Sequence, residues 1–122
     1  MKKLTFKEVV LRFVLVLAAV LVFTFFDWIV HSSSIYLSVP GFYYKNKIFY
    51  GTLLAFLSSL VLRKLPIVKQ SLFTTLITVG LLQIRYVLYG YPLYFHVIVL
   101  LEHFIFLWAS SYMALKLLYR IN

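Results

Sequence analysis

The chain has 122 residues, of which 64% are hydrophobic and 20% aromatic, and its formal net charge is +9. Its mean hydropathy of +0.99 leaves too little polar surface for a water-soluble domain, so the composition predicts an integral membrane protein. The absence of cysteine excludes disulfides, thiolate nucleophiles and cysteine-ligated metal centres. The basic residues lie at the ends of apolar segments, which suits helix orientation in a bilayer and argues against nucleic-acid binding.

The first apolar segment covers about residues 9–30 and is long enough to cross a hydrocarbon core of roughly 30 Å as a helix. It contains Arg12 near its start, which we expect at the membrane interface, and Asp27 near its end. The segment is longer than the apolar part of a secretory signal peptide, which favours a retained membrane helix. A connection rich in serine and tyrosine follows over residues 32–46, and its composition is typical of the interfacial region.

Three further helices are predicted after this connection, and two breaks separate them. Pro66, which follows a basic pair, ends the second helix, and the short segment Gly90-Tyr91-Pro92 forces the last two helices to be antiparallel neighbours. The predicted ranges are about 47–63, 70–89 and 93–119. The sequence therefore predicts an all-α fold: one antiparallel bundle of four transmembrane helices that occupies residues 1–122 as a single domain.

The distribution of basic residues predicts how this bundle is oriented. Nine of them fall on the side of the chain termini, and only Lys45 and Lys47 fall on the other side. The nine are Lys2, Lys3, Lys7, Arg12, Arg63, Lys64, Lys69, Lys116 and Arg120. Because basic residues gather in cytoplasmic segments, we expect both termini in the cytoplasm and the protein in the cytoplasmic or plasma membrane.

Ionisable side chains inside a membrane are costly, so each one is a candidate for function. Asp27 and His31 are four residues apart, and His96 and His103 are seven apart, so that each pair shares one helix face. Carboxylate and imidazole groups together suit zinc, copper or iron. We interpret Asp27, His31, His96 and His103 as a candidate metal site near the extracytoplasmic face. Structural hydrogen bonds by the same side chains remain an alternative, and haem between two of the histidines is a narrower one.

Arg85 lies inside the third predicted helix and needs an anionic partner. Only Asp27 and Glu102 are available in the same half of the bundle, and we expect an ion pair between Arg85 and Glu102. The chain has no nucleophile–base–acid triad and no paired carboxylates, which favours a role without catalysis.

The sequence thus favours a small polytopic membrane protein with a polar cluster that can bind a transition metal. The alternatives are a non-catalytic subunit of a larger membrane complex and a small oligomeric transporter or channel. Gly51, Ala55 and Ser58 form a stripe of small residues on the second helix, on which another helix can pack closely. With the small size of the bundle, this stripe predicts self-association or a larger complex, in addition to contact with membrane lipids.

Overall fold

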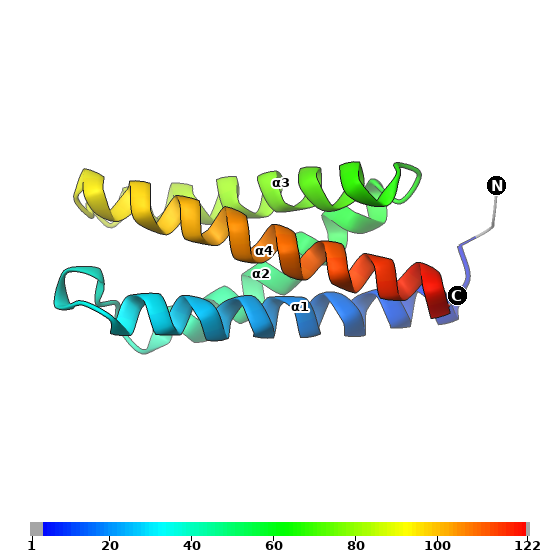
Figure 1. Cartoon of the computed structure of the whole chain (residues 1–122), viewed down its shortest axis with the longest axis horizontal. Helices are drawn as coiled ribbons and strands as arrows, with labels where there is room; N and C mark the ends of the chain where they lie inside the picture. The colour runs from blue at the N-terminus through cyan, green and yellow to red at the C-terminus, as the bar shows by residue number, and fades with distance from the viewer. Residues whose placement is uncertain (1–3, 122) are drawn as a thin grey trace.

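The computed structural model describes residues 4–121, and Lys2 and Lys3 lie outside this range. Four α-helices within it form one bundle, which confirms the all-helical fold (Figure 1). They are α1 (Phe6–Ser32), α2 (Phe42–Val61), α3 (Ile67–Leu88) and α4 (Leu93–Ile121), with a short 3-10 helix η1 (Ile35–Leu37) between α1 and α2. Each helix packs against the next, and α4 returns to pack against α1.

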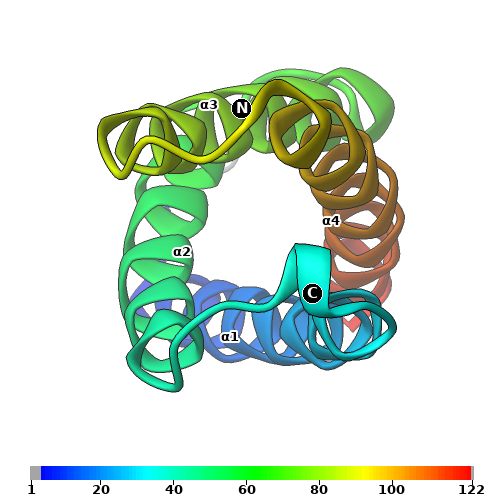
Figure 2. The ribbon, with the colours of Figure 1, turned by 90° about the vertical axis from the view of Figure 1, so that its left-hand side faces the viewer.

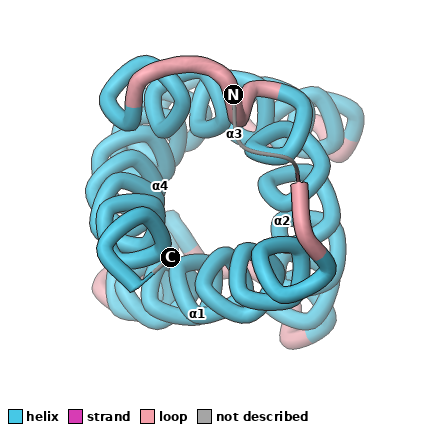
Figure 3. Tube along the Cα trace, turned by 90° about the vertical axis from the view of Figure 1, so that its right-hand side faces the viewer, coloured by secondary structure: helices cyan, strands magenta, loops and turns pink. Residues whose placement is uncertain are grey.

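The bundle has two distinct ends. Figure 2 and Figure 3 view it from these two ends and show the four helices arranged around one axis. The start of α1, the end of α4 and the connection between α2 and α3 lie together at what we call the terminal end (Figure 1). The segment that contains η1 and the turn between α3 and α4 lie at the opposite end, which we call the loop end.

Local sequence signals account for the helix ends. The side chain of Thr5 accepts a hydrogen bond of 3.1 Å from the backbone N–H of Glu8, which caps the start of α1. After α3, Gly90 adopts a φ of +74°, a left-handed conformation that glycine takes without strain. Pro92 then precedes the first residue of α4, as the predicted turn requires.

The main difference from the predicted elements is the start of α2. It begins at Phe42 rather than near residue 47, so the last part of the predicted loop is helical. The backbone N–H of Tyr43 donates to the carbonyl of Pro40 at 3.0 Å, which begins the first turn. This extra turn matters for the site, because it places Tyr43 and Lys47 four residues apart on the inward face of one helix.

The middle of the bundle combines an apolar core with buried threonines of α2 and α3, whereas the buried charges lie near its two ends. The central core consists of Val16, Val20, Phe23, Ala55, Val79 and Leu107. Gly51 belongs to this packing, since a Cβ atom at that position would lie 3.5 Å from Val20 Cγ1. Gly51 and Ala55 of the small-residue stripe on α2 are therefore used inside the bundle, whereas Ser58 is partly exposed. Of the described helices, α1, α3 and α4 are long and apolar enough to cross a membrane.

Candidate metal centre

Five buried polar side chains from three helices meet near the loop end. Two residues of α1 and two of α2, each pair one helical turn apart, face one residue of α4. These residues, which we call the loop-end cluster, are Asp27, His31, Tyr43, Lys47 and His103, and each is at most 7% exposed. Charged groups are rarely buried this completely unless they are paired or hold a ligand.

Asp27 lies at the centre of the cluster and has contacts on both of its carboxylate oxygens. Its Oδ1 lies 2.9 Å from His103 Nε2 and 3.2 Å from His31 Nε2. Its Oδ2 accepts a hydrogen bond from the ammonium group of Lys47. The carboxylate therefore joins α1 to both α2 and α4.

Asp27, His31 and His103 have the geometry of a metal-binding set. One ligand atom from each lies within 4.8 Å of the other two. Zinc bonds of about 2.0–2.1 Å at tetrahedral angles place ligand atoms roughly 3.3 Å apart. The two distances from Asp27 Oδ1 are near this value, and the ligand atoms of the two histidines lie within 4.8 Å of each other, so the three side chains can close around one ion.

The orientation of the His31 ring is fixed by a hydrogen bond at the nitrogen that faces away from Asp27. Its Nδ1 lies 2.5 Å from the backbone carbonyl oxygen of Leu37, and a carbonyl only accepts, so Nδ1 carries the proton. In the neutral ring, Nε2 then presents a lone pair to Asp27 Oδ1 and to the hydroxyl of Tyr43, which lies 3.1 Å away. A ring held through Nδ1 by a carbonyl, with Nε2 free to bind, is the usual arrangement of a metal-bound histidine.

Lys47 supplies a positive charge to the same cluster. Its Nζ lies 2.6 Å from the hydroxyl of Tyr43 and 2.7 Å from His103 Nε2, besides its contact with Asp27. His103 Nε2 is therefore next to a donor, the ammonium, and next to an acceptor, the carboxylate. A single ring nitrogen satisfies only one of them at a time.

Other polar atoms around His103 are left without partners. Its Nδ1 and both oxygens of Glu102 are buried and have no hydrogen-bond partner within residues 4–121, although Glu102 Oε2 comes within 3.4 Å of His103 Nε2. Buried polar groups normally pair, so this part of the cluster has unused capacity for binding.

His96 does not belong to the cluster. Its Nδ1 lies 2.7 Å from Nε2 of Gln83, and the ring is half-buried near the start of α4. Seven residues separate it from His103, which along a helix amounts to about 10 Å, so the shared face does not bring both rings to one ion. The structure thus brings three of the four predicted residues together, Asp27, His31 and His103, and metal binding by them stays a prediction.

The predicted ion pair between Arg85 and Glu102 is also not formed among the described residues. The guanidinium of Arg85 turns outward, donates to the hydroxyl of Tyr89 at 3.3 Å and lies 5.4 Å from the ring centre of Tyr50. Glu102 instead lies against His103. The positions of Arg85 and Glu102 along their helices predicted how deep each residue lies in the bundle. They did not predict whether each side chain points toward the neighbouring helix or away from it.

Lys47 and Tyr43 are the members of the cluster that the sequence analysis missed. Both were assigned to the interface, Tyr43 as part of the loop and Lys47 as an outward basic residue. The spacing Tyr43-x-x-x-Lys47 matches that of Asp27-x-x-x-His31, and it is the signal that identifies them once the earlier start of α2 is known.

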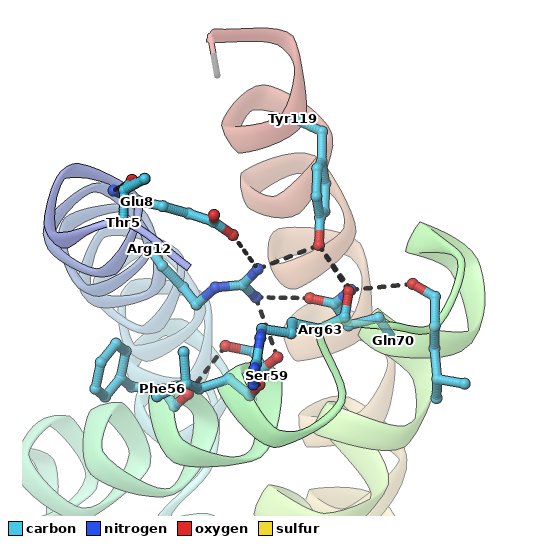
Figure 4. A network of polar contacts seen from close by, with 10 residues as sticks. Thr5, Glu8, Arg12, Phe56, Ser59, Arg63, Gln70 and Tyr119 are labelled. Carbon is cyan, nitrogen blue, oxygen red and sulfur yellow. Dashed lines mark hydrogen bonds and ion pairs between the residues drawn. The ribbon is translucent and has the colours of Figure 1, made fainter. Parts of the chain in front are cut away.

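A second buried charge lies at the terminal end of the bundle. Arg12, predicted to be interfacial, is 0% exposed and points into the bundle, where it meets all three other helices (Figure 4). One guanidinium nitrogen donates to the Ser59 carbonyl at 3.1 Å and to Gln70 Oε1 at 2.6 Å. The other donates to Glu8 at 3.3 Å and to the Tyr119 hydroxyl at 3.2 Å. We call these five residues the arginine cluster.

Comparison with protein-family models, with curated proteins and with solved structures gave no match to this chain. Its function is therefore argued from the geometry of these two clusters.

Proposed function

We propose that this protein spans the membrane four times and that Asp27, His31 and His103 bind one transition-metal ion, zinc in the first place, near the loop end. The observation that carries the metal assignment is the close approach of Asp27 Oδ1 to two imidazole nitrogens, His31 Nε2 at 3.2 Å and His103 Nε2 at 2.9 Å. In the neutral form of His31, with its proton on the Nδ1 that bonds to Leu37, Nε2 turns a lone pair toward Asp27 Oδ1, and a cation between these two atoms joins them.

The membrane assignment is supported by the distribution of polar residues, which lie inside the bundle while apolar residues cover its outside. Fully or almost fully buried positions hold Arg12, Asp27, Lys47, Gln70 and His103. The outward surface is apolar on every helix, with Val14, Leu21, Val22 and Phe25 on α1, Leu53 and Leu57 on α2, Leu76, Ile77 and Leu81 on α3, and Leu101 and Ile105 on α4. A water-soluble bundle shows the opposite pattern, whereas lipid tails match this one.

A span by α2 is part of the proposal, although its composition alone is less apolar than that of the other helices. Three of its polar residues, Lys47, Thr52 and Ser59, face the interior and are at most 6% exposed. Its 20 residues give a length of about 30 Å, which matches the hydrocarbon core.

The orientation follows from the positive charges. The terminal end carries Lys7, Arg63, Lys64, Lys69, Lys116 and Arg120, whereas the loop end carries Lys45 and Arg85, since Lys47 is internal. We propose that the terminal end faces the cytoplasm. Because the chain has no cysteine, single cysteines at Lys64 and Lys45 are clean probes. An impermeant thiol reagent added from outside is expected to label position 45 only, and labelling at position 64 contradicts the orientation.

Lys47 competes with a bound metal, because its ammonium takes up room beside the ligand atoms and its positive charge repels a cation there. Metal binding requires Nζ to withdraw from His103 Nε2, while its bond to Asp27 Oδ2 can persist and hold the carboxylate in place. The identity of the ion follows from the ligands, since two imidazoles and one carboxylate suit zinc, copper or iron. Haem is not favoured, because the rings of Phe23 and Tyr86 lie 5.2 and 5.7 Å from the ring of His103.

The experiment that tests the metal site is metal analysis of the detergent-purified protein after incubation with zinc. One equivalent is expected for the wild type and for His96→Ala, and strong loss is expected for Asp27→Asn and for His103→Ala. Lys47→Met should bind zinc about tenfold or more tightly, because it removes a competing charge at close range. Substoichiometric metal in both the wild type and Lys47→Met would sink the metal proposal.

A structural role is the second candidate, and the charge balance between Asp27 and Lys47 favours it. This pair and the two histidines join α1, α2 and α4 without any ion, as an accessory subunit of a larger complex requires. In that case the same substitutions lower thermal stability, and added zinc does not raise it. Self-association stays a proposal without a specific surface, since Gly51 and Ala55 are internal.

A further inference from the structure

A narrow cleft between α2 and α3 opens at the loop end and reaches the loop-end cluster. Tyr43 and Lys47 form its inner wall, and Leu82, Arg85 and Tyr89 line it from α3 and the following turn. Its cavity volume of about 20 Å³ has room for one guest of the size of a water molecule, because a water needs about 10–15 Å³. The cleft therefore gives small molecules, and only small ones, a route to the buried side chains.

The charges along this cleft select the sign of the guest. Arg85 is half-buried beside the opening, and Lys47 lies at the inner wall. The described residues that line the cleft include no aspartate and no glutamate. The charge of Lys47 is balanced by Asp27 behind the inner wall, so Arg85 supplies the net positive charge of the passage, which favours anions over cations.

We propose that this cleft delivers a small anion, such as hydroxide, to an open position on the metal ion. This inference rests on the proposed metal site. Asp27, His31 and His103 supply three ligands, whereas zinc takes four, and three protein ligands with one exchangeable ligand distinguish a reactive zinc site from a structural one.

The contacts at the inner wall support the connection between cleft and metal. The hydroxyl of Tyr43 lies 3.1 Å from His31 Nε2 and 3.4 Å from His103 Nε2. The same hydroxyl accepts from Lys47 Nζ at 2.6 Å. A guest at the inner end of the cleft is thus next to the side chains that surround the ion, and its negative charge lies beside the ammonium of Lys47, to which it offers the acceptor that His103 no longer provides.

Fluoride binding to the cobalt-loaded protein tests this inference, because fluoride has the charge of hydroxide and fits a space the size of one water molecule. Co²⁺ takes the same ligands as zinc, and its visible absorption reports both loading and changes of coordination. Fluoride is expected to change the spectrum of the wild type. Arg85→Gln should weaken fluoride binding roughly threefold, because a partly exposed charge contributes a modest attraction. Leu82→Phe, which fills the cleft, should abolish the fluoride response while the cobalt spectrum persists.

Arg120→Gln is the matched control, since it removes the same charge at the terminal end and should leave fluoride affinity unchanged. A cobalt spectrum that fluoride does not alter overturns the inference and leaves the metal site standing. A fluoride response that is equal in the wild type, Arg85→Gln and Leu82→Phe overturns the cleft as the route. Failure of cobalt to bind at all overturns the proposed function, and this inference with it.

Discussion

The arginine cluster and the loop-end cluster bury charge in the same bundle, yet their polar atoms are satisfied in different ways. The guanidinium of Arg12 donates four hydrogen bonds, one to an oxygen atom on each of the four helices. Only its Nε is buried without a partner in the described part of the chain. In the loop-end cluster, one nitrogen of His103 faces a donor and an acceptor together, and its Nδ1 and both oxygens of Glu102 find no hydrogen-bond partner among residues 4–121.

This difference separates a structural cluster from a candidate site. A guanidinium is always charged and presents fixed donors, so it suits a permanent junction of helices. Aspartate, histidine, tyrosine and lysine exchange protons or bind metals, and a set of them with unused capacity suits a ligand. We therefore expect substitutions in the arginine cluster to change stability alone, and substitutions in the loop-end cluster to change both stability and binding.

The largest effect on stability is expected at the pair of Asp27 and Lys47. Asp27→Asn leaves a buried ammonium without its counter-charge and should lower the free energy of unfolding by about 3–5 kcal/mol. Adding Lys47→Met to Asp27→Asn should recover much of this loss, because the double variant buries no unpaired charge. Thermal unfolding in detergent of both single variants and the double variant measures the coupling. Strictly additive losses would show that the two side chains do not interact.

A smaller effect is expected when the arginine cluster is removed. Arg12→Met should cost about 2–4 kcal/mol, because Gln70 and the carbonyl of Ser59 lose a buried partner. Zinc stoichiometry should remain that of the wild type, since the loop-end cluster lies at the opposite end of the bundle. Thermal unfolding and metal analysis of the same preparation check both points. A variant that folds but no longer binds zinc contradicts the division between the clusters.

The two histidines of α4 provide a matched comparison within one helix. His103→Ala should weaken zinc binding by at least about tenfold, the scale expected when a site loses a ligand or its support. His96→Ala should change affinity little, since its ring bonds to Gln83 outside the cluster. Titration with zinc, followed by the shift in thermal stability, gives both values. Equal losses would return His96 to the ligand set.

The helices were predictable because each is marked by an apolar run and a clear break. The break at Pro66 separates α2, which ends at Val61, from α3, which begins at Ile67, and α3 ends at Leu88 before Gly90, which takes a positive φ. The start of α2 was not predictable from these signals. Lys47 on a short polar stretch is typical of an interface, and only the tertiary contact with Asp27 accounts for its burial.

The sequence predicted only the part of the candidate site that lies within one helix. Spacing within one helix brought Asp27 and His31 together, because residues four apart share a face. Spacing says nothing about how one helix is rotated against another, and this rotation selects His103 over His96 and turns Arg85 away from Glu102. Partners from different helices therefore need the packed structure.

The smallest effect is expected at Arg85, and it sharpens the comparison by testing a charge that belongs to neither cluster. The guanidinium is bonded to Tyr89 near the loop-end surface, so Arg85→Gln should change the free energy of unfolding by about 0.5 kcal/mol or less. Combined with Glu102→Gln, its effect should be additive within about 0.3–0.5 kcal/mol, because no contact joins the two side chains within residues 4–121. Glu102→Gln combined with His103→Ala should instead depart from additivity, since Glu102 Oε2 lies 3.4 Å from His103 Nε2. The two double-variant cycles share Glu102→Gln, and unfolding measured under one condition compares them directly. Strong coupling to Arg85 would mean that its side chain turns inward in the membrane, and the cleft would then lose the cation at its opening.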